Sequence, residues 1–250
     1  MRTRGGRLVP IVLVVLAARS GAQELGPGER AAIDSGRQVV IAEKVKGSSW
    51  PRLTVYQFIA GSPEEVAAVF FDYERHASFL PNVRRSRISR VLDSATAEVD
   101  YTLRVPIVSD ESYTVRDRLT SSVIDSGTDV RSYRVEWTLV RATSTKAADG
   151  EARFEPYRDG TLLTYRNLVV PGSRLAGLGF IRGRAQRDVR ATVRAIAAQV
   201  VKERTHDRAL LDEQVRALRA VAGHPRIGEP TPPPPEQLER VLPSLAPSGA

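Results

Sequence analysis

The spacing of apolar residues changes from a helical period to a period of two near Pro81. Before that point, apolar side chains recur at helical spacing from Val66 to Tyr73, which predicts a helix with one buried face. Ser62 is suited to cap this helix, Pro63 to its first turn, and Glu65 completes a capping box with Ser62. We therefore expect a well-defined helix that begins after Ser62.

After Pro81, apolar and polar residues alternate in runs long enough for strands. The clearest runs are 97–105, 113–119, 133–139 and 163–169, and each places apolar or aromatic residues on one side only. Sequences typical of turns separate the runs, at 108–110, 125–127, 148–150 and 158–160. This pattern predicts an antiparallel sheet with one buried face and one face in water.

Further elements flank this region. A short helix is expected over 28–35, a first strand over 38–42 and a second strand over 53–60. A long helix is expected to begin near 173–178, after Pro171 and Gly172, and its apolar stripe continues to Val200. One sheet with a single apolar face and one long amphipathic helix predict a two-layer α+β fold, in which a curved antiparallel sheet wraps around the C-terminal helix.

The two ends of the chain differ from this central part. Three arginines precede an apolar run of eleven residues, Leu8–Ala18, and small residues follow it. This is the pattern of a cleaved secretory signal over residues 1–22, and it predicts a periplasmic or secreted protein; a retained anchor is the alternative. The main domain is expected over 23–204, a further helix that prolongs the long helix or folds back over 205–222, and a Pro-rich disordered tail over 223–250.

Composition excludes some classes of partner and leaves others open. The net charge of +8 falls to about +4 once the arginines of the signal are removed, and no recognition element accompanies the remaining basic residues, so nucleic acid is not an expected partner. The chain has no cysteine and therefore no disulfide.

One side of the long helix carries three arginines, Arg187, Arg190 and Arg194. They either form its solvated face or contact a membrane surface. The tail could dock onto an envelope protein partner.

The buried face of the predicted sheet is unusually rich in side chains with a polar end. Apolar walls with a few convergent polar groups are what a hydrophobic ligand requires, although the same side chains could instead fill a core against the helix. Asp117 needs a partner if it is buried, and an ion pair with a neighbouring arginine is the simplest one. The candidate lining residues are Tyr101, Leu103, Tyr113, Val115, Asp117, Trp137, Leu139, Tyr165, Asn167, Leu178, Phe180 and Ile181.

Motifs for catalysis or for cofactors are weak. His76 comes at the end of the helix that begins after Ser62 and is expected at the surface, and none of the three histidines has metal-ligand spacing with acidic residues. A metal is therefore not expected. No Gly-rich phosphate loop follows a strand, so a nucleotide cofactor is not expected either. An enzyme would have to use Asp117, Tyr101 or Tyr165 as acid–base groups, and the sequence favours a binding protein instead.

Several segments carry a resemblance to a known family. They are Ala60–Val66, Phe71–Arg75 and Phe79–Val83, with weaker support from 99–101, 137–140 and 163–165. With these segments the chain resembles the START-like superfamily of polyketide cyclases and lipid transport proteins, and within it the coenzyme Q-binding-like branch, over about residues 50–202.

The resemblance implies a helix-grip fold with a hydrophobic pocket between sheet and helix, but it does not identify the ligand. The expected function is an exported carrier of a lipid, quinone or isoprenoid. A cyclase or hydrolase that acts on an aromatic or polyketide-like substrate, and an envelope interaction module, are the alternatives.

Overall fold

The chain forms one sheet of eight antiparallel strands in the order β1-β2-β8-β7-β6-β5-β4-β3. The computed structural model describes residues 25–105, 110–125, 130–172 and 179–222, and it describes only the backbone at 125, 130 and 179–182. The strands are β1 Val39–Glu43, β2 Arg52–Ile59, β3 Val83–Asp93, β4 Thr96–Leu103, β5 Glu111–Asp125, β6 Val130–Ala142, β7 Ala147–Tyr157 and β8 Gly160–Val170. The predicted signal and the Pro-rich tail lie outside the described residues.

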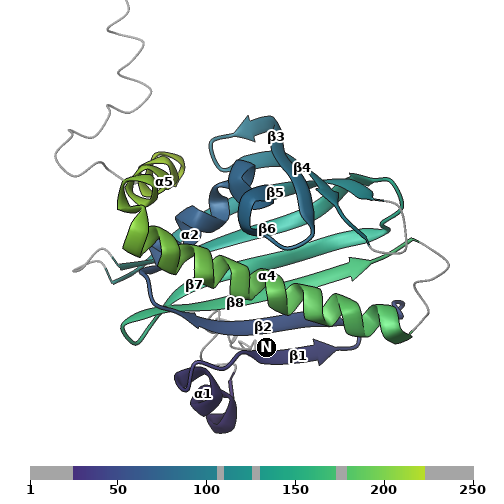
Figure 1. Cartoon of the computed structure of the whole chain (residues 1–250), viewed down its shortest axis with the longest axis horizontal. Helices are drawn as coiled ribbons and strands as arrows, with labels where there is room; N and C mark the ends of the chain where they lie inside the picture. The colour runs from purple at the N-terminus through teal and green to yellow at the C-terminus, as the bar shows by residue number, and fades with distance from the viewer. Residues whose placement is uncertain (1–24, 106–109, 126–129, 173–178, 223–250) are drawn as a thin grey trace, which may run out of the picture.

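Helices cover both faces of the sheet, but unequally. They are α1 Pro27–Asp34, α2 Pro63–Phe71, a 3-10 turn Tyr73–Arg75, α3 His76–Phe79, α4 Gly179–His206 and α5 Arg208–Val221. The sheet curves around α2 and the long α4, which lie on its inner face (Figure 1). The predicted α+β helix-grip architecture is therefore confirmed. None of the helices in the described part is both long and apolar enough to span a membrane.

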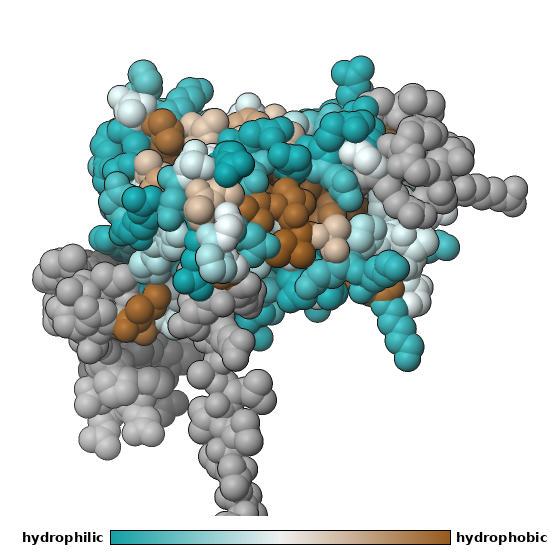
Figure 2. Space-filling model, turned by 90° about the horizontal axis from the view of Figure 1, so that it is seen from below, coloured by the Kyte–Doolittle hydropathy of each residue, from teal (hydrophilic) through white to brown (hydrophobic). Residues whose placement is uncertain are grey.

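The short α1 packs on the outer face beside the edge strand β1. Its Ile33 is buried in a small second core together with Tyr56 and Leu162. Viewed from the side of α1 and β1, the surface shows a patch of hydrophobic residues surrounded by hydrophilic ones (Figure 2). The main core lies on the other face of the sheet, between the strands and α2, α4 and α5.

The helix α2 begins as its sequence predicts. The Ser62 hydroxyl accepts a hydrogen bond from the Glu65 amide at 3.2 Å, and the Glu65 carboxylate accepts one from the Ser62 amide at 2.9 Å. The same carboxylate pairs with Arg204 of α4 and Arg208 of α5 at 3.3 and 2.6 Å. One buried capping residue therefore also ties three helices together.

The predicted faces of the strands are confirmed, but one predicted turn is wrong. Residues 148–150 lie inside β7 and pair with β8, and the sequence analysis predicted neither β7 nor β3. Gly150 suggested a turn, whereas its lack of a side chain serves close packing inside the sheet. The strand β3 lacks a regular apolar alternation because three register shifts interrupt its pairing with β4, and each shift changes which side chains face inward.

Of the two alternatives for the last helix, the structure shows the fold-back. The chain turns at Asp207, whose side chain accepts a hydrogen bond from the Leu210 amide, and α5 then packs against α2. Leu211, Val215 and Leu218 join the main core. This segment is thus a structural part of the domain rather than an appendage.

Candidate functional site

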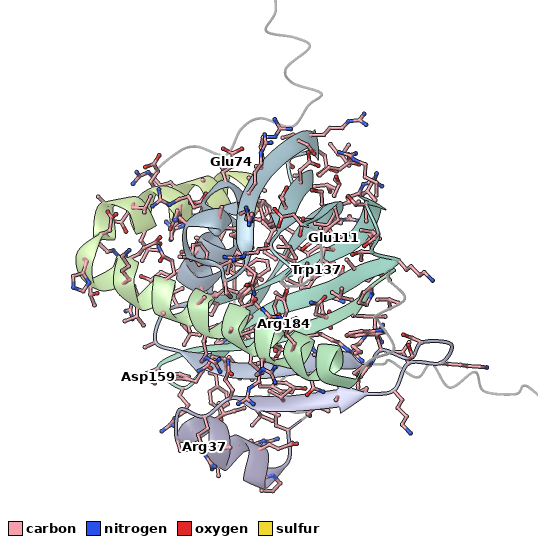
Figure 3. The ribbon with its side chains drawn as sticks, turned by 45° about the vertical axis from the view of Figure 1, so that its right-hand side comes forward. Arg37, Glu74, Glu111, Trp137, Asp159 and Arg184 are labelled. Atoms are coloured by element: carbon pink, nitrogen blue, oxygen red, sulfur yellow. The ribbon has the colours of Figure 1, made fainter. Side chains whose placement is uncertain are left out.

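Four residues from four strands form a row across the inner face of the sheet. In the strand register, Asp117 lies opposite Trp137, Trp137 opposite Gly150, and Gly150 opposite Asn167. A Cβ atom at Gly150 would lie only 2.4 Å from the Trp137 ring. The indole therefore lies over the glycine, in register between the two polar residues. Figure 3 shows Trp137 in the middle of the sheet.

Both polar members of this row carry an oxygen without a partner. Among the described residues, Asp117 Oδ2 and Asn167 Oδ1 are buried and accept no hydrogen bond. The predicted ion pair between Asp117 and an arginine is wrong, because the described residues supply no cation to this carboxyl group. Arginines occupy the outer face of the same strand, and a one-residue step along a strand reverses the direction of a side chain. Buried oxygens of this kind usually have a partner, so a bound molecule or water is expected to meet them.

Burial changes the ionisation of Asp117. The side chain is 4% exposed, and burial raises its pKa to about 8. The carboxyl group is therefore mainly protonated at neutral pH, because ionisation would leave a charge unpaired in an apolar surrounding. A protonated carboxyl can donate a hydrogen bond to a bound molecule as well as accept one.

Tyrosines surround the row. The rings of Trp137 and Tyr165 lie 5.2 Å apart, and those of Tyr101 and Tyr113 lie 5.6 Å apart. Burial first, and the nearby Asp117 second, raise the pKa of Tyr113 and Tyr101 above the ordinary value. These hydroxyl groups therefore stay protonated and can donate hydrogen bonds within the site.

His76 belongs to this cluster and is not at the surface, so that prediction is wrong. The ring is 2% exposed, and its Nε2 lies 2.8 Å from the Phe70 carbonyl oxygen, which can only accept a hydrogen bond. Nε2 therefore carries the hydrogen, and Nδ1 accepts from the Tyr101 hydroxyl at 2.9 Å. Burial lowers the pKa of His76 to about 4, so the ring is neutral and holds Tyr101 in place.

The inner face is closed at one end and more open at the other. Val135 and Leu163, which lie toward α2 and α5, are fully buried, whereas Val169 at the far end of β8 is 40% exposed. Between them lie Tyr101, Tyr113, Leu139, Tyr165 and Asn167, all of which keep partial access to solvent. Burial raises the pKa of the three tyrosines although each keeps some exposed surface, so they lie where the buried and the more open parts of the inner face meet.

The long helix shows the same gradient. Val193, Ile196 and Val200 in its C-terminal half are fully buried, whereas no described side chain from 183 to 192 is. Among its described side chains, the helix therefore packs most tightly on the sheet and α2 through its C-terminal half. The open end of the sheet faces the other half.

The predicted lining residues on the strands do share the inner face. They are Tyr101, Leu103, Tyr113, Val115, Asp117, Trp137, Leu139, Tyr165 and Asn167. Leu178 lies outside the described residues, and Phe180 and Ile181 lie in the first turn of α4, whose side chains are not described. That all twelve line one cavity stays a prediction.

Sequence reasoning missed three contributors. Gly150 makes room for Trp137, Phe70 packs its ring 5.3 Å from Phe154, and the buried Tyr73 hydroxyl has no partner among the described residues. Phe70 and Tyr73 carried a signal, since both lie on the buried side of the predicted helix. Within the described ranges, no three His, Cys, Asp or Glu side chains come together as metal ligands do.

Comparisons with known proteins agree on the fold. No family model matches the chain, and no curated protein matches it in sequence. Among solved structures, the chain is similar to a STAR-related lipid transfer protein from Xanthomonas axonopodis, with a TM-score of 0.55 and 17% identity, over 65% of this chain and 93% of that one. It is also similar to human STARD10, with a TM-score of 0.60 and 12% identity, over 74% of this chain and 78% of that one.

These likenesses cover 65% and 74% of the chain. The chain therefore has the START-like fold, as the sequence resemblance implied. The coenzyme Q-binding-like branch is not singled out among the neighbours.

Proposed function

We propose that this protein binds a hydrophobic small molecule, such as a lipid, quinone or isoprenoid, on the inner face of its sheet and carries it outside the cytoplasm. The observation that carries the proposal is the row of Asp117, Trp137 and Asn167. It combines two buried oxygens that have no partner among the described residues with an aromatic surface on the partly exposed part of the inner face.

The chemistry of the row indicates which part of the ligand would reach it. Uncharged hydrogen-bonding groups suit Asn167 Oδ1 and the protonated Asp117, whereas a fully ionised group would be unfavourable in this buried position. The aromatic side chains beside them suit rings or unsaturated chains. The fold of the Xanthomonas lipid transfer protein is compatible with this assignment.

Export is part of the proposal and rests on residues 1–22. We expect the full chain, produced in a Gram-negative host, to appear in the periplasm without these residues and with a small molecule bound. Native mass spectrometry of the purified protein tests both points. The mass of the ligand-free chain shows whether residues 1–22 have been cleaved, and the additional mass of the complex identifies the ligand. An empty protein that takes up no molecule from a total lipid extract would contradict the carrier function, and retention of residues 1–22 would contradict cleavage alone.

Trp137 offers a direct optical test of where a ligand binds. The chain has two tryptophans, so a Trp50→Phe variant keeps Trp137 as its single tryptophan. We expect the methyl ester of cis-parinaric acid, an uncharged polyene that absorbs tryptophan emission, to quench this variant strongly, with a dissociation constant of about 1 μM or lower. Quenching should be reversed by competing unlabelled lipid or quinone.

The complementary Trp137→Phe variant is the matched control. It should bind the same methyl ester but show much weaker energy transfer from Trp50. Equal energy transfer in the two variants would place the ligand away from the row.

A further inference from the structure

The outer face of the sheet carries a hollow that the proposed function does not use. It has a volume of about 420 Å³ and spans β3, β4, β5 and β6. Arg85, Arg87 and Arg141 contribute its cationic groups, and Asp100 is its only acidic lining residue in the described part of the chain. The hollow therefore carries an excess of two positive charges.

The strand register arranges these residues in two neighbouring rows. In the first row, Arg87 lies opposite Asp100, Asp100 opposite Thr114, and Thr114 opposite Arg141. Asp100 lies 3.5 Å from the Arg87 guanidinium, 3.0 Å from that of Arg141 and 2.6 Å from the Thr114 hydroxyl. One carboxylate thus holds two guanidinium groups on either side of itself.

The second row has cationic and hydroxyl groups but no acidic residue. Arg85 lies opposite Thr102, and Thr102 lies opposite Ser112. The two hydroxyl groups are 3.3 Å apart and bond only to each other among the described residues, and Arg85 has no ion pair there. An oxyanion above these hydroxyls would accept their hydrogen bonds and lie between arginines from both sides of the hollow.

We propose that this hollow binds a phosphate group, carried either by a lipid headgroup or by a free phosphate. Guanidinium groups match the geometry of phosphate oxygens, and the uncharged hydroxyls add donors without adding repulsion. Tyr101 and Tyr113 also line the hollow, but the arginines and hydroxyls that would hold the phosphate lie on the face of the sheet opposite the row of Asp117. This inference therefore does not depend on the proposed function.

The test is calorimetry with inorganic phosphate, together with co-sedimentation with vesicles of phosphatidylcholine alone or mixed with phosphatidylglycerol. We expect Arg85→Gln and Arg141→Gln each to weaken binding about tenfold, which corresponds to about 1.4 kcal/mol, and added salt to weaken it further. Arg134→Gln is the matched control, because Arg134 lies on the same outer face of β6 but pairs with Glu151 at 2.6 Å outside the hollow.

The outcomes distinguish a soluble phosphate from a lipid headgroup, and a specific site from attraction by general charge. Binding of phosphate without vesicles assigns the site to a soluble phosphate, and binding of the mixed vesicles assigns it to a lipid headgroup. Equal losses in Arg141→Gln and Arg134→Gln would show attraction by general charge and overturn the site. Absence of binding to either probe by the unmodified protein would overturn it as well.

Discussion

An Asp117→Asn variant is expected to be more stable than the natural protein by on the order of several kcal/mol near pH 9, and by only on the order of 1–2 kcal/mol near pH 5. The ordinary pKa of this carboxyl is 3.8, and burial raises it to about 8 in the folded state. Between these two values the folded protein keeps a proton that the unfolded chain releases. The free energy of unfolding therefore falls as pH rises through this window, and a neutral asparagine removes that loss.

Urea unfolding at a series of pH values measures this effect. His76 acts in the opposite direction, since its lowered pKa of about 4 makes stability fall as pH drops below the ordinary value of 6.5. Its contribution is present in both proteins and cancels in their difference. Asp110→Asn, at an exposed carboxylate, is the control and should change stability by no more than about 0.5 kcal/mol at either pH. Parallel pH profiles for Asp117→Asn and the natural protein would show that this carboxyl is ionised in the folded state.

A Gly150→Ala variant is expected to lose about 2–3 kcal/mol of stability and to lose ligand binding as well. The added Cβ would lie 2.3 Å from the Arg166 carbonyl oxygen and 2.4 Å from the Trp137 ring, so the indole or the strand must move. Movement of the indole would also disturb the oxygens of Asp117 and Asn167 on either side of it.

Thermal or urea unfolding measures the loss of stability, and near-ultraviolet circular dichroism reports the environment of Trp137. The matched control is Gly28→Ala in α1, where a Cβ atom meets nothing within 4 Å. That substitution should leave stability unchanged or raise it by about 0.5–1 kcal/mol. If Gly150→Ala were as stable as Gly28→Ala and kept its tryptophan signal, the close packing of the indole on the strand would be refuted.

The local sequence pattern predicted the buried aromatic face of the sheet but not the register between its strands. Alternation along each strand placed Tyr101, Tyr113 and Trp137 on one side, because successive side chains of a strand point in opposite directions whatever the partner strand is. It could not show that Asp117 lies in register with Trp137 and Asn167. That register depends on pairing between strands that are distant in the sequence.

His76 and Gly150 show where local pattern fails. A histidine at the end of a short helix is commonly exposed, and only the covering strand β4, which brings the Tyr101 hydroxyl, makes it part of the core. A glycine after an alanine and an aspartate resembles a turn, and only the neighbouring indole explains it as a residue within a strand.

The sequence by itself determined the helix that begins after Ser62, the two faces of the central strands, the long C-terminal helix and the α+β class, because capping and periodicity act within a few residues. The tertiary structure alone decided the places of β7 and β3 in the sheet, the fold-back of α5, the burial of His76 and the absence of a partner for Asp117 Oδ2 among the described residues. Each of these depends on contacts between segments far apart along the chain, whose free energies no local pattern encodes.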